Sequence, residues 1–175
     1  MNSVLNQLQR EIASSLHGLD ATQTQLRPLS APGKWSIQQI VEHLLLTYSG
    51  AEMALKARLV KRRPTAAKPS AFQQIQQFTV YRIGYFPGGR QAPATVTPAP
   101  ATHPLSGEEL TTAVEDRLTR FATLCTETEQ LFGSNQCASH NVLGPLSVDQ
   151  WRRFQLIHGR HHVKQIAAIR KAHNL

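Results

Sequence analysis

The stretch Trp151–Ile169, WRRFQLIHGRHHVKQIAAI, constrains the fold most, because it reads as one amphipathic helix with histidines in its middle. Successive residues of an α-helix turn by about 100°, so His162 lies about 40° from His158 and one turn further along the axis. Apolar side chains share this direction, whereas the Lys and Arg residues of the stretch point elsewhere. Two imidazoles therefore stand one above the other on the face that should contact a protein core.

Two histidines four residues apart on one helix face can chelate a single metal ion. The alternative is a pair of core histidines, each hydrogen-bonded to a neighbour. This helix alone does not decide between the two. A third ligand from elsewhere in the chain would favour the metal site.

The chain of 175 residues is long enough for one domain over residues 1–175, and its 41% hydrophobic content predicts a folded core. The formal net charge is +8, which favours an anionic partner or a solvated basic surface. The basic residues are spread over several predicted helices without interleaved aromatic residues. We therefore favour the solvated surface, and we do not expect a nucleic-acid partner.

Two cysteines without a CxxC motif give neither a disulfide framework nor a Cys-rich zinc site. The N-terminal sequence MNSVLNQLQREI lacks the apolar core of a signal peptide, and no stretch is long enough to cross a membrane. The sequence predicts a cytoplasmic protein with no membrane partner.

Apolar residues recur at three- and four-residue spacing in each of four segments, which is typical of amphipathic helices. Three segments begin with a capping box, in which a Ser is followed three residues later by Gln or Glu. These patterns predict an all-α protein, a four-helix bundle with antiparallel or mixed directions. The predicted helices cover residues 2–20, 36–63, 106–133 and a last helix that begins at Ser147.

Seven of the ten prolines lie between residues 64 and 104. A short helix is predicted at Ser70–Tyr81, and residues 87–104 are predicted to form an extended, Pro-rich crossover between helices two and three. Long loops in compact domains often cover a site. The alternative is a plain connector between the two ends of the bundle.

No segment alternates polar and apolar residues over any length, so no β-strand is predicted. Residues 134–146, SNQCASHNVLGPL, are accordingly predicted to form a loop. His140 in this loop either lines the site or is solvated, and we favour solvation.

His43 lies two turns into helix two, where small residues share its face: Thr47, Gly50, Ala54 and Ala57. This row either lets another helix approach closely or leaves room for a ligand beside His43. Glycine in mid-helix costs up to about 1 kcal/mol relative to alanine, so Gly50 should have a packing or pocket role.

In a bundle, side chains from facing helices can converge on one internal point. If helices two and four align suitably, His43, His158 and His162 would bind one divalent ion through neutral imidazoles. Three protein ligands leave a fourth position for water, as in catalytic sites. Such an ion lowers the pKa of a bound water or substrate thiol. Spacing alone does not show that His43 reaches the other two.

Two sequence blocks carry a family resemblance: PGKWSIQQIVEHL at Pro32–Leu44 and HGRHHVKQI at His158–Ile166. A Trp-Ser helix start that leads to a His, followed far downstream by H-x-x-H-H-x-x-Q-I, resembles the DinB-like superfamily, which includes the YfiT-type proteins. The segment LGPLSVDQWRRF is also similar to the family's approach to its last helix. The resemblance covers essentially the whole chain.

The resemblance implies a four-helix bundle that holds a divalent metal ion, nickel or zinc first and iron as a further candidate. Carried over by position, the ligands are His43, His158 and His162. His161 matches an adjacent histidine that is not counted as a ligand, and the divergence of about 100° between neighbouring helical residues agrees. Gln165 matches a recurrent glutamine, for which a pocket role next to the ligands is implied. The alternative for Gln165 is an ordinary hydrogen bond between helices.

Characterised relatives include transferases and isomerases that use low-molecular-weight thiols such as mycothiol or bacillithiol, and others are called metal-dependent hydrolases. The resemblance thus implies a metal-dependent enzyme that activates a thiol or water, with a small-molecule substrate. The alternative is a non-enzymatic helical bundle with a structural metal or a polar histidine core. The single short chain and its Pro-rich crossover differ from the longer transferases, which leaves the substrate open.

A second apolar stripe lies on the far side of the last helix from His158, at Leu156, Val163 and Ala167. These residues pack either on another helix of the same chain or on a second copy. A homodimer is therefore one prediction from the sequence.

Overall fold

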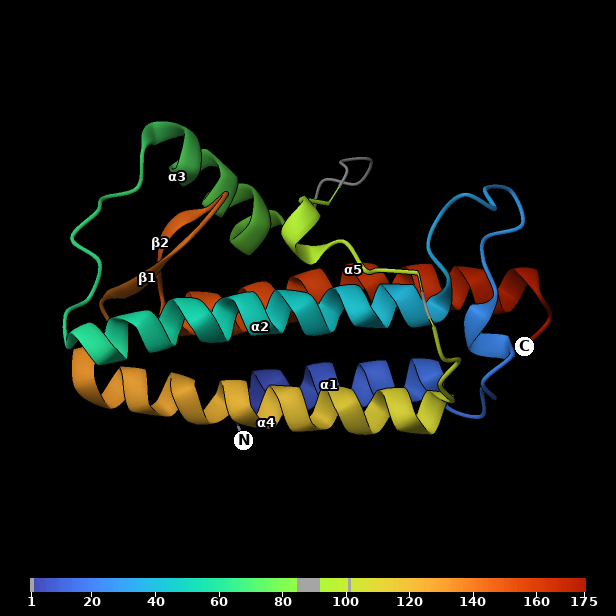
Figure 1. The fold of residues 1–175 in the computed structure, drawn as a ribbon. Helices are drawn as coiled ribbons and strands as arrows, with labels where there is room; N and C mark the ends of the chain where they lie inside the picture. The colour runs from blue at the N-terminus through green and yellow to red at the C-terminus, as the bar shows by residue number, and fades with distance from the viewer. Residues whose placement is uncertain (1, 85–91, 101) are drawn as a thin grey trace.

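The computed structural model describes residues 2–84, 92–100 and 102–175. Its main body is a bundle of long helices, as the sequence predicts (Figure 1). Between them lie shorter helical segments and one small antiparallel sheet. The long helices are α1 (Ser3–Leu16), α2 (Ile37–Lys61), α4 (Gly107–Phe132) and α5 (Val148–Ala172).

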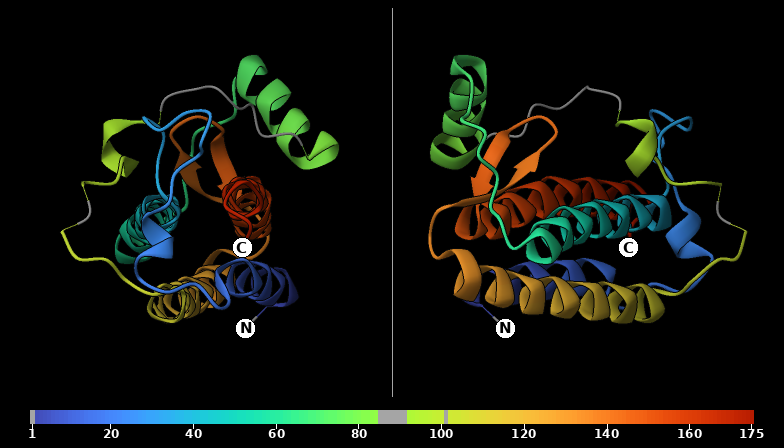
Figure 2. Two further views of the ribbon diagram at one scale, coloured as in Figure 1. Left: turned by 90° about the vertical axis from the view of Figure 1, so that its right-hand side faces the viewer. Right: turned by 60° about the vertical axis from the view of Figure 1, so that its left-hand side comes forward.

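Each long helix packs on two neighbours, in the order α2, α5, α1 and α4 around the bundle (Figure 2, left). Helices α1 and α5 run in one direction, whereas α2 and α4 run in the other (Figure 1). The bundle is therefore mixed. Since the neighbours α2 and α4 are parallel, the chain between them has to return over the full length of the bundle.

Serine side chains begin the helices as predicted. Ser36, Ser106 and Ser147 each accept a hydrogen bond from the backbone N–H three residues on, and the Gln or Glu side chain at that position accepts the serine N–H in return. All three predicted capping boxes are confirmed. A fourth, Ser70 with Gln73, starts α3.

The core is aliphatic, with Leu5, Leu8, Ile12 and Leu16 of α1 fully buried. Glycines permit the closest approaches between elements. A Cβ built on Gly107 would collide with the backbone carbonyl of Leu16, at the place where the Gly107 N–H donates to Leu19 O at 2.9 Å. This contact ties the start of α4 to the end of α1.

The apolar stripe opposite His158 packs mainly within the chain. Leu156 and Val163 are half-buried against the core, whereas Ala167 is exposed. For the first two residues the structure thus supports the intrachain alternative. Among the described helices, none combines the length and the apolar character that crossing a bilayer requires.

The connection from α2 to α4 contains the predicted short helix. It is α3 (Ala71–Phe78), extended by a π-helical turn, η2 (Thr79–Ile83). Of the predicted crossover 87–104, residues 87–91 and 101 lie outside the described residues. Its described part holds a 3-10 turn, η3 (Ala94–Val96), which contacts α2 (Figure 1).

The prediction of a loop at residues 134–146 is wrong in part. Strands β1 (Gln136–His140) and β2 (Gly144–Ser147) form an antiparallel hairpin with an irregularity between Gln136 and Ala138. Adjacent residues of these short strands are buried together, so no period-two pattern marks them in the sequence. Gly144 adopts φ +71°, which helps the turn between the strands.

The prediction that His140 is solvated is also wrong. Its ring is half-buried, with its centroid 5.4 Å from that of Trp151 and 4.6 Å from that of Phe154. Nδ1 accepts the backbone N–H groups of Val142 and Leu143 at 3.1 and 3.2 Å, which closes the hairpin turn. Burial lowers the pKa of His140 from its ordinary 6.5 to about 4.

We expect the His140 ring to stay neutral when the pH falls from 8 to about 5, because desolvation penalises the imidazolium. The measurement is the imidazole carbon-bound proton shift in a two-dimensional NMR titration, with the peak assigned through a His140→Gln variant. Because the folded pKa is depressed, the ring favours the folded state at neutral pH, and this contribution declines as the pH falls from 6.5 toward 4. A midpoint near 6.5 would instead indicate the solvated loop residue that the sequence suggests.

Two glycine substitutions should change stability in opposite directions. Gly107→Ala should lower the free energy of unfolding by about 1–3 kcal/mol, because its Cβ meets a backbone carbonyl that cannot move without shifting α1. Gly50→Ala should raise it by up to about 1 kcal/mol, because no described atom lies within 4 Å of the added Cβ and alanine favours the helix. Urea unfolding measures both changes, and equal effects would contradict the described packing.

Candidate metal centre

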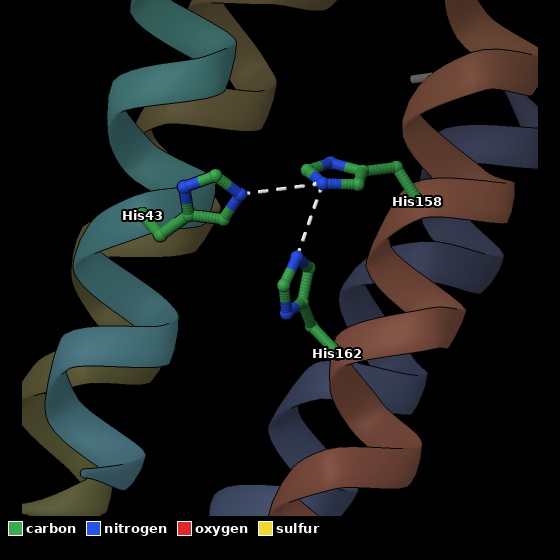
Figure 3. Close-up of side chains that lie close together, drawn as sticks. All are labelled: His43, His158 and His162. Atoms are coloured by element: carbon green, nitrogen blue, oxygen red, sulfur yellow. Dashed lines mark hydrogen bonds between the residues drawn. The ribbon is translucent and has the colours of Figure 1, made fainter. Parts of the chain in front are cut away.

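The packing of α2 against α5 brings three histidines together. His43 lies in the second turn of α2, and His158 and His162 lie one turn apart on α5 (Figure 3). Each side chain is at most 5% exposed. The structure therefore supplies what the spacing could not show, namely that His43 reaches the pair on α5.

The three rings direct their Nε2 atoms toward one point. His43 Nε2 lies 3.3 Å from His158 Nε2, and His162 Nε2 lies 3.0 Å from the same atom (Figure 3). One nitrogen from each ring lies within 4.8 Å of the other two. This is a group of donor atoms close enough to coordinate one ion.

The outer nitrogens of two rings are held by acceptors. His43 Nδ1 lies 2.7 Å from the backbone oxygen of Val96, and His162 Nδ1 lies 2.8 Å from Oε1 of Gln165. Since both oxygens only accept, each Nδ1 carries the proton, and in the neutral ring the Nε2 lone pair is bare. The second hydrogen bond of the Gln165 amide agrees with this orientation, because its Nε2 donates to His161 Nε2 at 3.1 Å while its Oε1 faces His162.

These tautomers test whether a metal ion fits. The bare Nε2 atoms of His43 and His162 both face His158 Nε2, which carries one proton at most and can donate a well-aligned hydrogen bond to only one of them. A buried acceptor left without a partner costs about 1–3 kcal/mol. A divalent cation would accept all three lone pairs at once, so the donor set fits such an ion.

The electrostatics keep the rings in the form that binds metals. Burial is the main cause that lowers the pKa of all three histidines. Mutual repulsion adds to it at His158, whose pKa lies well below 6.5, and at His162, whose pKa falls to about 3. All three imidazoles are therefore neutral at pH 7, with no proton to release before coordination.

Aromatic rings fix the imidazoles from the sides. Trp35 lies with its ring centroid 4.9 Å from that of His43, and Phe154 stacks on His158 at 5.5 Å with 12° between the planes. The sequence suggested Trp35 only as an apolar residue before a helix start. Its place against His43 has no local sequence signal, because Trp35 lies before the N-cap Ser36 and outside α2.

Val96 is the site residue that the sequence could not reveal. It contributes a backbone oxygen, which carries no residue-type signal, and it stands 53 positions from His43 in the crossover. The predicted crossover thus touches the site at η3. This supports the alternative that the segment covers a site rather than only connecting two helices.

The residues predicted next to the ligands lie close to them. Gln165 is exposed, and its amide contacts both His162 and His161. The His161 ring is half-buried, with its centroid 5.1 Å from that of His162, and does not belong to the converging group. The roles of these side chains at a bound metal stay predictions.

The small residues of α2 have different surroundings. Thr47 donates its hydroxyl to the backbone oxygen of His43 at 2.9 Å, so it contacts the helix backbone below the ring. Gly50 is half-buried, and no described atom lies within 4 Å of a built Cβ. The described contacts favour room beside α2 at this position over a close helix approach.

Fold and site together define a helical bundle with a buried three-histidine centre between its second and its last helix. The DinB superfamily matches residues 5–166, and the chain belongs to this superfamily. Searches among curated proteins and among solved structures return no match.

Removing the Gln165 hydrogen bond should weaken metal binding. Gln165→Leu leaves the Nδ1–H of His162 without its acceptor. We expect metal affinity to fall roughly 10- to 100-fold, as is usual when a hydrogen-bond partner of a ligating histidine is removed. Gln165→Glu keeps an acceptor oxygen and should lose much less. Competition with a coloured chelator measures both affinities, and indistinguishable values for Leu and wild type would contradict the orienting role.

Proposed function

We propose that this protein is a metal-dependent enzyme in which His43, His158 and His162 hold one divalent ion that activates a thiol or water. The observation that carries the proposal is the convergence of three Nε2 atoms. Two of them have a bare lone pair, because the rings of His43 and His162 donate their Nδ1–H to Val96 O and Gln165 Oε1. Such an orientation is the usual arrangement behind metal-ligating histidines.

Nickel and zinc are the ions we propose first, with iron as the third. Neutral imidazole suits all three, and the cluster contains no thiolate or carboxylate among the described residues. The family resemblance supports the same order. Three protein ligands leave coordination positions for a substrate atom or water.

When bound, the ion would lower the pKa of a coordinated thiol or water toward neutrality. The chain's own residues hold and orient the three imidazoles, and the rings of Trp35 and Phe154 shield His43 and His158 from water. Among the described residues, the cluster contains no carboxylate. No carboxylate of the cluster is therefore available as the base that accepts a proton from the thiol or water.

The proposed substrate is a small molecule used with a low-molecular-weight thiol, and the reaction class is S-transfer or hydrolysis. We place it in the cytoplasm, where the two unpaired cysteines, both buried, fit a reducing environment. We keep the homodimer as part of the proposal. Exposed Leu46, Met53 and Val60 follow a seven-residue spacing on α2 that suits helix pairing.

The second candidate is a non-enzymatic bundle in which the histidines form a structural metal site or a polar core. The burial of all three rings to 5% exposure or less is the observation in its favour. It predicts that metal raises stability without any catalysed reaction.

The test compares wild type with His158→Ala and with His103→Ala, a control that removes an exposed histidine. The proteins are purified without a metal-affinity column, and bound metal is measured by mass spectrometry. We expect about one equivalent in wild type and the control, and a loss in His158→Ala. Metal-loaded wild type and control, but not His158→Ala, should then turn over substrates in a screen of thiol transfer and hydrolysis.

The other outcomes separate the two candidates. If the wild type takes up no nickel, zinc or iron on titration, this would contradict both a catalytic and a structural metal site. The polar histidine core would then be the remaining interpretation. One equivalent of metal that raises the melting temperature, with no turnover by any loaded protein, would identify the structural bundle instead.

A further inference from the structure

Helix α3 is turned with polar side chains toward the β1–β2 hairpin. The Gln77 amide donates to the backbone oxygens of Leu143 and Pro145 at 2.7 and 3.2 Å, which attaches α3 to the hairpin. Val80 of η2 is buried, but four other large apolar residues of α3 and η2 are exposed by 58–64%. We call them the α3 apolar face: Phe72, Ile75, Phe78 and Ile83.

This arrangement is the reverse of that of an ordinary surface helix, which buries its apolar stripe. At about 100° per residue, Phe72, Ile75 and Phe78 lie within about 120° of one another on one side of α3. Helix α3 also stands away from the four long helices (Figure 2, right). Its exposed side is therefore open to a partner outside the bundle.

The net positive charge of the chain is concentrated in the part of the sequence that contains α3. Residues 53–107 contain eight of the 19 Lys and Arg residues and none of the 11 Asp and Glu residues. The rest of the chain is thus balanced, and this segment carries the whole formal net charge of +8. Lys68 lies just before α3 and Arg82 lies in η2, both exposed, so exposed cations stand at both ends of the α3 apolar face.

We propose that the α3 apolar face docks on an anionic lipid surface, with Phe72, Ile75 and Phe78 in the acyl boundary and Lys68 and Arg82 at the phosphates. A helix that lies in the interface combines apolar burial with attraction between basic residues and anionic headgroups. A second copy on this face would oppose two patches of the same sign. A nucleic acid would use the cations but not the exposed Phe and Ile side chains.

This inference departs from the prediction of no membrane partner. That prediction rested on the lack of a segment long enough to span a bilayer, and interfacial binding needs no such length. The inference is also independent of the metal site, since α3 contributes no residue to the histidine cluster.

The experiment is flotation of the full-length protein with vesicles. One set is phosphatidylcholine alone, and the other contains about one-third phosphatidylglycerol. We expect the wild type to float with the anionic vesicles at low salt and much less at high salt or with phosphatidylcholine alone, because salt screens the headgroup charge.

Matched variants separate apolar docking from charge alone. Ile75→Ser with Phe78→Ser should weaken partitioning about tenfold or more, since both side chains lose their apolar contact with lipid. Leu29→Ser, a control with the same 64% exposure as Ile83 but on the loop before α2, should bind like wild type. All the substituted residues are exposed, so thermal unfolding should show that the variants are folded.

Three results would overturn the proposal. The first is no flotation with anionic vesicles at low salt. The second is equal partitioning of the double variant and the Leu29 control, which would reduce the binding to charge alone. The third is a wild-type dimer in solution that the double variant dissociates, which would identify a second copy as the occupant of the face.

Discussion

The antiparallel packing of α2 against α5 is the contact on which the candidate metal centre depends. It places His43 opposite His158 and His162, so that the Nε2 atoms of His43 and His162 come within 3.3 Å of His158 Nε2. A bundle core normally excludes such a concentration of polar atoms, because each buried lone pair needs a partner. The bundle therefore holds between α2 and α5 an arrangement that is costly without a cation and favourable with one.

Much of this could be predicted from the sequence, because the signals are local. Helix periodicity, the Ser capping boxes and the spacing of His158 and His162 all act within a few residues. The membership of His43 needed the family resemblance, since no local rule states which helices become neighbours. The resemblance and the structure agree on the three residues that meet, and the ion that they hold stays a prediction.

The misses have physical reasons. The β1–β2 hairpin is too short for a period-two pattern and buries adjacent residues together. His140 is half-buried by Trp151 and Phe154, residues that are more than ten positions away in sequence. The exposure of the α3 apolar face is not predicted either, because the pattern of Phe72, Ile75 and Phe78 predicts a helix but not which way that helix faces. Orientation is decided by tertiary contacts, here the hydrogen bonds of Gln77.

The segment between α2 and α4 connects these observations. Because α2 and α4 are parallel neighbours, the chain must return along the bundle, and at η3 the returning segment contacts α2 and reaches His43. Val96 lies in this segment, and its carbonyl oxygen accepts the Nδ1–H of His43, with 2.7 Å between the nitrogen and the oxygen. A plain connector would leave this buried nitrogen to find another acceptor. The topology that makes the long connection necessary thus also supplies the acceptor that orients one of the three histidines.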